Sequence, residues 1–293
     1  MMSALPKTAI VTGASSGIGR AAAIALASQG WRIIGTGRDP GRIADAQRKL
    51  RAVSDGRAPI DIVRADLSIL SEAAALAETI RGMTPGIDIL LNNAGGMTES
   101  LKLTAEGLEE GFAANHLGPF LLTQRLLPLL QAAARKAEKG SVRIIFTSSG
   151  ASESAPPVNF DDIQNLTGFS PGKTYCSVKL ANVLVMRELA QRAESWGIVV
   201  HAAAPGPVAS RFFEYAPQET RDHVSDLPMM TEAEGADTIV WLATDPEAGR
   251  STGGYWQGRK QRRPHPQANE PDVLARFWAE SESLITRITS DIR

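Results

Sequence analysis

A tyrosine and a lysine, Tyr175 and Lys179, stand four residues apart in a segment whose pattern predicts a helix over 175–193. Side chains at that spacing lie on one face of a helix. A free tyrosine has a pKa of about 10 and is a poor acid–base group at neutral pH. A nearby ammonium favours the phenolate and lowers that pKa towards the range of efficient proton transfer. Such a pair is common by chance, so its surroundings decide its weight.

A glycine-rich turn, TGASSGIG at 12–19, joins a predicted strand to a predicted helix. Gly13 permits a tight turn, Gly17 lets the backbone approach a pyrophosphate, and Gly19 allows close packing of helix on strand. The helix N-terminus presents free N–H groups to phosphate. The spacing is G-x-x-x-G-x-G. Taken alone it is a weak signal, and an ordinary helix-entry turn is the alternative.

Short apolar runs alternate with helical patterns along the chain. They predict strands at 8–13, 31–37, 60–67, 87–95, 142–149 and 198–206, and helices at 18–29, 42–51, 71–80, 108–130 (one helix or two) and 175–193. This alternation predicts an α/β fold, a doubly wound Rossmann-type parallel sheet covered on both faces. Ligands of such sheets bind at the carboxyl ends of the strands.

The length of 293 residues fits a single nucleotide-binding domain over 1–258, with a substrate lid at about 207–230 and a C-terminal extension at 259–293 packed on the domain. The net charge of −1 argues against nucleic-acid partners. The single cysteine, Cys176, excludes an internal disulfide. The longest apolar stretch is too short to span a membrane, and we expect a cytoplasmic protein.

No metal site is expected. The four histidines have no metal-like spacing, and we interpret them as structural: His116, His201, His223 and His265.

Three motifs in order resemble the short-chain dehydrogenase/reductase family: TGASSGIG, NNAG at 92–95 and Y-x-x-x-K at 175–179. The resemblance covers residues 7–207. FAANHLGPFLLT at 112–123 and TYCSVKLANVL at 174–184 are similar to the retinol-dehydrogenase-like and WW-domain-oxidoreductase-like branch. The resemblance implies an enzyme that interconverts an aldehyde or ketone with an alcohol by hydride transfer, with Tyr175 as general acid and base.

The same resemblance implies roles for two further residues. Ser149, preferred to Ser148, would hydrogen-bond the substrate carbonyl and orient it towards the hydride. Asn115 would keep Lys179 connected to bulk water. The alternative for Asn115 is a helix-interior asparagine that makes a local backbone bond.

The cofactor positions also follow from the resemblance. They are Gly13, Ser15, Ser16, Gly17, Ile18, Gly19, Arg38, Asp66, Leu67, Asn93, Ala94, Gly95, Tyr175, Lys179, Pro205, Gly206, Val208 and Ser210. Gly37 stands where NAD-preferring members carry an acidic residue, and Arg38 after it can pair with a 2′-phosphate. We therefore expect NADP(H) rather than NAD(H). The alternative is that Arg38 is a solvated turn residue and Asp39 turns back to the ribose.

Two other functions fit the sequence less well. A non-catalytic NADP(H)-sensing regulator typically lacks the tyrosine or lysine, and here all four catalytic positions are filled. A sugar epimerase of the extended type prefers T-G-x-x-G-x-x-G and a larger C-terminal domain.

The chain also departs from the branch, because Ala204 replaces its usual histidine and Pro207 follows the Pro-Gly pair. Three aromatic residues of the lid line an apolar substrate pocket or cover the core: Phe212, Phe213 and Tyr215. The identity of the substrate and a homo-oligomeric state are left open.

Overall fold

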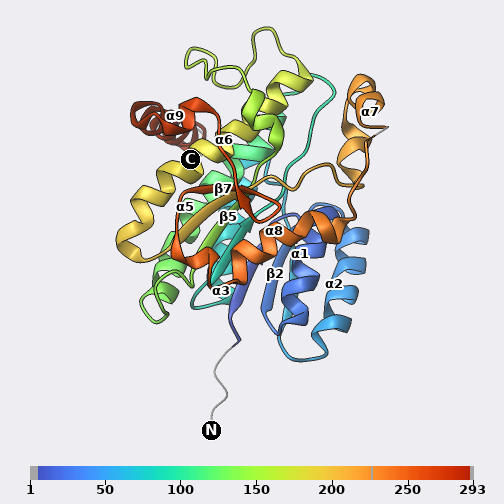
Figure 1. Cartoon of the computed structure of the whole chain (residues 1–293), viewed down its shortest axis with the longest axis vertical. Helices are drawn as coiled ribbons and strands as arrows, with labels where there is room; N and C mark the ends of the chain where they lie inside the picture. The colour runs from blue at the N-terminus through green and yellow to red at the C-terminus, as the bar shows by residue number, and fades with distance from the viewer. Residues whose placement is uncertain (1–5, 226, 291–293) are drawn as a thin grey trace.

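The computed structural model of the chain describes residues 6–225 and 227–290. Within these ranges, the backbone alone is described at 213, 215, 223–225 and 290. Its centre is one sheet of order β3-β2-β1-β4-β5-β6-β7-β8 (Figure 1). The strands are β1 (Thr8–Val11), β2 (Arg32–Gly37), β3 (Ile60–Arg64), β4 (Ile89–Asn92), β5 (Arg143–Thr147), β6 (Val199–Ala203), β7 (Gly254–Gln257) and β8 (Lys260–Gln261). β8 pairs antiparallel with β7, and the other described pairs are parallel.

Helices cover both faces of the sheet. The α-helices are α1 (Gly17–Ser28), α2 (Pro40–Ser54), α3 (Leu70–Met83), α4 (Glu110–Phe112), α5 (Gly118–Ala134), α6 (Pro171–Ala193), α7 (Gln218–Ser225), α8 (Glu232–Thr244) and α9 (Pro271–Ser290). The doubly wound parallel sheet predicted from the sequence is confirmed. The strand order reverses direction between β1 and β4, where such folds bind their ligands.

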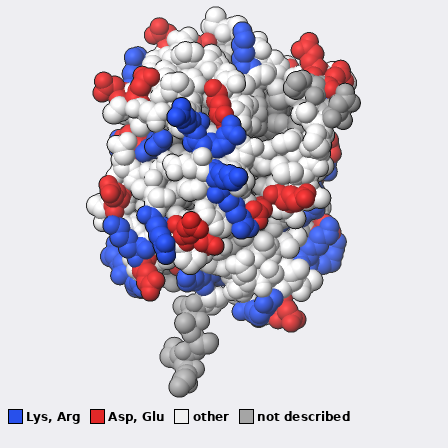
Figure 2. All heavy atoms as spheres, viewed as in Figure 1, with Lys and Arg blue, Asp and Glu red and all other residues white. Residues whose placement is uncertain are grey.

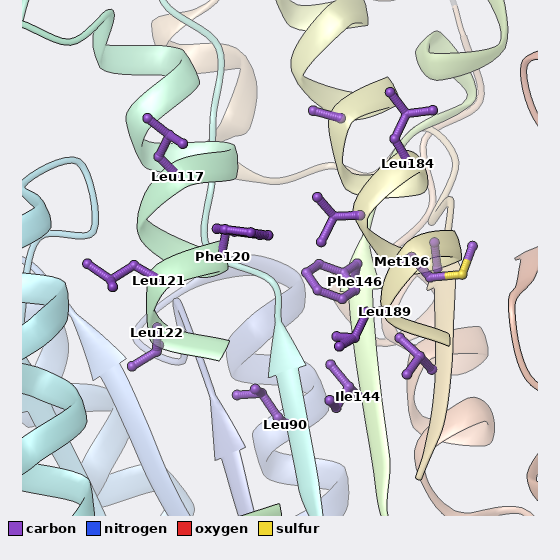
Figure 3. Packing of buried hydrophobic residues seen from close by; sticks show 14 of the residues in the cluster. Leu90, Leu117, Phe120, Leu121, Leu122, Ile144, Phe146, Leu184, Met186 and Leu189 are labelled. Carbon is purple, nitrogen blue, oxygen red and sulfur yellow. The ribbon is translucent and has the colours of Figure 1, made fainter. Parts of the chain in front are cut away.

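The strands bury side chains on both faces. Alternate residues point to opposite sides, so Ile10 and Leu90 join a core with α3, α5, α6 and α9, while Val11 and Leu91 join a core with α1, α2 and α8. Figure 3 shows the first core: Leu90 of β4 and Ile144 of β5 face the apolar side chains of α5 and α6. Burial on both sides explains why these strands are continuous apolar runs.

The six predicted strands are present, but most end earlier than predicted because the residues after them leave the sheet and form turns and loops. The predicted helix at 108–130 is three pieces: α4, a π-helix at Ala113–Leu117, and α5. In the π-helix the N–H of Gly118 bonds to the carbonyl of Ala113, five residues back. Single π turns within helices are rare and frequent at functional sites.

Five helices and strands of the C-terminal third were not predicted: β7, β8, α7, α8 and α9. A signal for α8 was available, since Thr231 and Glu234 form a capping box at its start. Helix α9 packs on α6, and its Phe277 and Trp278 are buried. Charged side chains of both signs are interspersed on the face drawn in Figure 2.

The long segment that leads from β5 into the first turn of α6, residues 152–173, is held by hydrogen bonds at two points. The N–H of Val158 donates to Gln267 (2.8 Å), and Gln164 accepts from the backbone N–H of Glu109 (3.0 Å). Residues 152–173 thus connect the C-terminal extension to the start of the helical segment that carries Asn115.

The two ends of the predicted lid, which form its neck, are joined by backbone hydrogen bonds. Val208 and Met230 form an isolated bridge, with the N–H of Ala209 donating to the carbonyl of Met230 (2.8 Å) and the N–H of Met230 to that of Pro207 (2.9 Å). Within the lid lie a 3₁₀ turn (Arg211–Tyr215) and α7. The guanidinium of Arg221 lies 3.7 Å from the carboxylate of Glu99, in the loop after β4. The lid therefore reaches across to the opposite loop.

Candidate active site

The glycine turn and the NNAG turn meet at the carboxyl ends of β1 and β4. The hydroxyl of Thr12 accepts from the N–H groups of Asn93 (2.8 Å) and Ala94 (2.9 Å) and donates to the carbonyl of Leu91 (3.2 Å). The side-chain amide of Asn93 donates to the carbonyl of Thr12 (3.1 Å). Both turns are therefore held as one unit. Thr12 was missed as a positioning residue, although it opens the TGASSGIG motif.

The turn is shaped to receive a phosphate group. Gly13 and Gly17 have positive φ angles of 70° and 59°, a region that favours glycine. A Cβ on Gly19 would lie 2.5 Å from the carbonyl oxygen of Gly13, so the helix packs on the turn as closely as predicted. Ser16 is the N-cap of α1 but makes no side-chain cap bond. The first N–H groups of α1 therefore have no side-chain cap. This fits a pyrophosphate bound at the glycine turn.

The end of β2 is also a close-packed position. A Cβ on Gly37 would lie 2.7 Å from the hydroxyl of Ser15, so an acidic side chain has no room there as the turn stands. Arg38 lies half-exposed, with its guanidinium 3.4 Å from the carboxylate of Asp66. Asp39 accepts the N–H of Arg42 (2.8 Å) and caps α2. The carboxylate of Asp39 is thus engaged by the first turn of α2.

Asn115 is turned towards the loop after β4. Its amide donates to the carbonyls of Gly96 (2.9 Å) and Gly111 (2.8 Å), and its oxygen accepts from the N–H of Gly96 (3.1 Å). The bond to Gly111 is the local backbone bond of the alternative interpretation. The two bonds to Gly96 are additional contacts with a distant segment. A Cβ on Gly95 would collide with the Asn115 amide and lie 3.3 Å from the Lys179 ammonium. The structure therefore brings Asn115, Gly95 and Lys179 together.

Lys179 is buried beneath Tyr175. Its ammonium donates to the carbonyl of Thr147 (3.4 Å) and lies 5.6 Å from the centre of the Tyr175 ring. Burial lowers the pKa of Lys179 to about 8. The two side chains thus share a face of α6, as their spacing predicts.

Ser149 and Ser148 are used differently. The hydroxyl of Ser148 donates to the carbonyl of Lys179 (2.8 Å) and is occupied in the core. The hydroxyl of Ser149 accepts from the N–H of Ala151 (3.2 Å) and lies close enough to the phenol of Tyr175 to lower the pKa of that phenol. The structure therefore brings Ser149, and not Ser148, against the phenol.

The pKa of Tyr175 differs from the sequence expectation. Burial is the largest influence and raises this pKa above its usual value, while the bond with Ser149 lowers it by less. The side chains packed around the partly buried Tyr175 disfavour a charged phenolate, and the Lys179 ammonium lies 5.6 Å from the centre of its ring. The protein's own groups therefore favour the neutral phenol over the phenolate.

The remaining predicted cofactor residues, Pro205, Gly206, Val208 and Ser210, lie after β6 at the neck of the lid. Gly206 has a φ of 88°. The Cβ of Ser210 would lie 3.8 Å from a Cβ placed on Gly17, so the neck passes over the glycine turn. The ring of Phe212 lies 5.1 Å from that of Tyr175. The side chains of Phe213, Tyr215 and His223 lie outside the described residues.

Within residues 6–225 and 227–290, no group of three or more His, Cys, Asp or Glu side chains is arranged to hold a metal ion. Over the same residues, no helix has the length and apolar character needed to cross a bilayer.

Comparison with known proteins gives the family. The short chain dehydrogenase family model matches residues 7–221. Human retinol dehydrogenase 14 is 32% identical over 296 residues, covering 95% of this chain and 86% of its own. A Streptomyces sp. (strain C5) protein named as a daunorubicin C-13 ketoreductase is 34% identical over 290 residues, covering 95% and 92%. The chain belongs to the short-chain dehydrogenase family, in its retinol-dehydrogenase-like branch, and is an oxidoreductase of that family.

Solved structures agree on the fold. Pseudomonas aeruginosa RhlG, solved in an active-site complex with NADP, superposes with a TM-score of 0.70 at 27% identity, covering 87% of this chain and 95% of that one. The 3-ketoacyl-(acyl-carrier-protein) reductase of Brucella melitensis, complexed with NADH, gives 0.67 at 22% identity, covering 87% and 97%. Members of this fold family thus bind nicotinamide cofactors of both kinds.

The buried lysine makes the stability of the protein depend on pH. An unfolded lysine has a pKa of about 10.4, whereas that of Lys179 is about 8. Between these values the unfolded chain holds a proton that the folded chain has released, so stability rises with pH. We expect the free energy of unfolding of the wild type to gain about 2–3 kcal/mol between pH 8 and 10 relative to Lys179→Met. Urea unfolding of both proteins measures this difference, and parallel pH profiles would contradict it.

Proposed function

We propose that this oxidoreductase uses NADP(H) to interconvert an apolar aldehyde or ketone with its alcohol, with Tyr175 as general acid and base. The observation that carries the proposal is the grouping of the Tyr175 phenol, the Ser149 hydroxyl and the buried Lys179 ammonium beside the glycine cradle. Three such groups at one sheet edge suit proton transfer to an oxygen that gains charge.

The cofactor would lie along the sheet edge. The first turn of α1 and the glycines before it would hold the pyrophosphate. Arg38 would pair with the 2′-phosphate, and Asp66 and Leu67 would contact the adenine. Lys179 would hold the ribose hydroxyls next to the nicotinamide. When bound, NADPH supplies the hydride that the carbonyl carbon receives.

The protein's residues would handle the oxygen. Ser149 and Tyr175 hydrogen-bond the substrate carbonyl and hold its carbon towards the cofactor. As negative charge develops on that oxygen, Tyr175 donates its proton, which the neutral phenol carries at neutral pH. Lys179 and Asn115 lie behind the phenol, on the way to the backbone of Gly96. In the reverse direction, Tyr175 accepts the proton of an alcohol, and the positive charge of the oxidised nicotinamide favours the phenolate.

The substrate would enter between the lid and the loop after β4. Phe212 against Tyr175 gives this entrance an apolar wall. This favours apolar carbonyl compounds, in keeping with relatives named for retinol and for daunorubicin. A cytoplasmic location remains a prediction from the composition.

The preference for NADP(H) is expected to depend on Arg38. In Arg38→Ala we expect the KM for NADPH to rise about 10- to 100-fold, because a charge-assisted pair with phosphate is lost. The KM for NADH should stay within about twofold, since NADH has no 2′-phosphate. Arg48→Ala is the control, because Arg48 is an exposed arginine of α2 paired with Asp45. An equal rise of KM for both cofactors would show that Arg38 does not bind the 2′-phosphate.

The test of the proposed function is turnover. NADPH oxidation is followed against a panel of aldehydes, ketones and quinones, with NADH in parallel. Turnover with NADPH supports the reductase and its cofactor. Faster turnover with NADH would overturn the cofactor preference and leave the enzyme. Tight NADPH binding without turnover on any substrate would favour a regulator that senses NADP(H).

A further inference from the structure

A second tyrosine, Tyr255 of β7, lies directly behind the turn that carries Ser149. Tyr255 is fully buried. Its hydroxyl donates to the backbone carbonyl of Ser149 (3.0 Å). The same carbonyl accepts from the N–H of Ser152 (3.0 Å), which closes the 3₁₀ turn at Gly150–Ser154. The hydroxyl of Tyr255 is therefore the side-chain support of the backbone at Ser149.

The phenol of Tyr255 is itself held by a small polar cluster. The carboxylate of Glu153 lies 3.2 Å from its oxygen, and the hydroxyl of Ser152 donates to it at 3.4 Å. Arg262, beyond β8, donates to the other Glu153 oxygen (2.7 Å). The backbone N–H of Arg262 also bonds to the carbonyl of Tyr255 (2.8 Å). The cluster thus runs from a partly exposed arginine inward to Ser149.

The pairing of Arg262 with Glu153 decides where the Tyr255 proton goes. A phenol has one proton to donate, and here two acceptors lie within reach, the Ser149 carbonyl and Glu153. The guanidinium of Arg262 donates to Glu153, so this carboxylate competes less strongly for the Tyr255 proton. The proton is then free to hold the Ser149 carbonyl.

We propose that Tyr255 is a positioning residue for Ser149, and that the Glu153–Arg262 pair keeps the Tyr255 hydroxyl directed at the Ser149 carbonyl. The proposal rests on the proposed function, because Ser149 is taken to orient the substrate carbonyl. Tyr255 itself touches neither substrate nor cofactor and acts only through the Ser149 backbone.

The enzymatic test is a double-mutant cycle in the full chain. Tyr255→Phe keeps the ring and removes only the hydroxyl. We expect kcat/KM for carbonyl reduction to fall about tenfold, the usual net worth of one hydrogen bond, with NADPH affinity unchanged. In a Ser149→Ala background the same substitution should change the residual kcat/KM by less than about twofold, since the group it positions is gone. An equal loss in both backgrounds would mean a general structural role and would overturn the proposal.

Two further variants sharpen the cycle. Ser152→Ala removes a hydroxyl from the same buried cluster but leaves the contact between Tyr255 and Ser149, so it is expected to keep wild-type kcat/KM within about twofold. Arg262→Met frees Glu153 to compete for the Tyr255 proton. It should lower kcat/KM in the same direction as Tyr255→Phe, and again not in the Ser149→Ala background. Because the side chain of Arg262 is exposed, Arg262→Met remains informative if Tyr255→Phe does not fold.

A readout without turnover separates this proposal from the proposed function. Amide hydrogen exchange is measured for Ala151 and Ser152, whose N–H groups bond to the Ser149 hydroxyl and carbonyl. Tyr255→Phe is expected to speed both exchanges at least about tenfold, and Ser152→Ala is not. Unchanged exchange would overturn the proposal even in an active enzyme. Faster exchange in a protein without turnover would support it while the proposed function fails.

Discussion

Tyr175→Phe is expected to lower kcat for carbonyl reduction by about 10²- to 10⁴-fold, the usual contribution of a positioned general acid. The substitution removes only the hydroxyl that would protonate the alkoxide. The ring keeps its packing against Phe212 and above the Lys179 ammonium. Stopped-flow and steady-state NADPH oxidation measure the loss, with the substrate found in the panel above.

Binding and folding controls belong with this variant. The dissociation constant for NADPH, from its fluorescence, should stay within a few-fold because the pyrophosphate and 2′-phosphate positions are far from the phenol along the sheet edge. The melting temperature should change little, since a ring remains in the core. A Tyr175→Phe enzyme that keeps more than about a tenth of the wild-type kcat would exclude Tyr175 as the acid. A large loss of NADPH affinity would instead assign it a binding role.

Gly118→Ala is expected to destabilise the protein by about 3 kcal/mol or more, at or beyond the upper end for overpacked positions. A Cβ on Gly118 would overlap the carbonyl oxygen of Leu67 and lie 2.9 Å from its carbonyl carbon. Both atoms are backbone, so no side chain can rotate away. Gly118 also closes the π turn through its bond to Ala113. Urea unfolding measures the loss, and NADPH affinity should fall with it because Leu67 is a predicted adenine contact.

The matched control is Gly82→Ala. Gly82 is in α3, and a Cβ there would meet nothing within 4 Å. Alanine in such a helix position typically stabilises by about 0.5–1 kcal/mol over glycine. The same substitution is thus expected to act with opposite sign at the two sites. A Gly118→Ala protein as stable as the wild type would show that α5 can move away from Leu67, and the close approach would then carry no structural weight.

Much of the nucleotide-binding half was predictable from local pattern. Continuous apolar runs at β1, β4 and β5 signal strands buried on both faces, and the glycines after β1 signal a phosphate turn. β7 and β8 were not predicted because they are short, four and two residues long, and take their place only by pairing with β6 and with each other. Helix α9 escaped because its apolar face becomes recognisable as core only against α6.

The sequence by itself determined the family and the doubly wound sheet and predicted the residues of the site, because motif residues at fixed spacing and strand-end turns are local properties. The tertiary structure decided how those groups behave. Burial reversed the expected direction of the Tyr175 pKa, since desolvation depends on every element packed around the phenol. The π turn directed Asn115 to Gly96, and β7 brought Tyr255 behind Ser149. These contacts join residues 19 and 106 positions apart, and no local pattern encodes which distant atoms will meet.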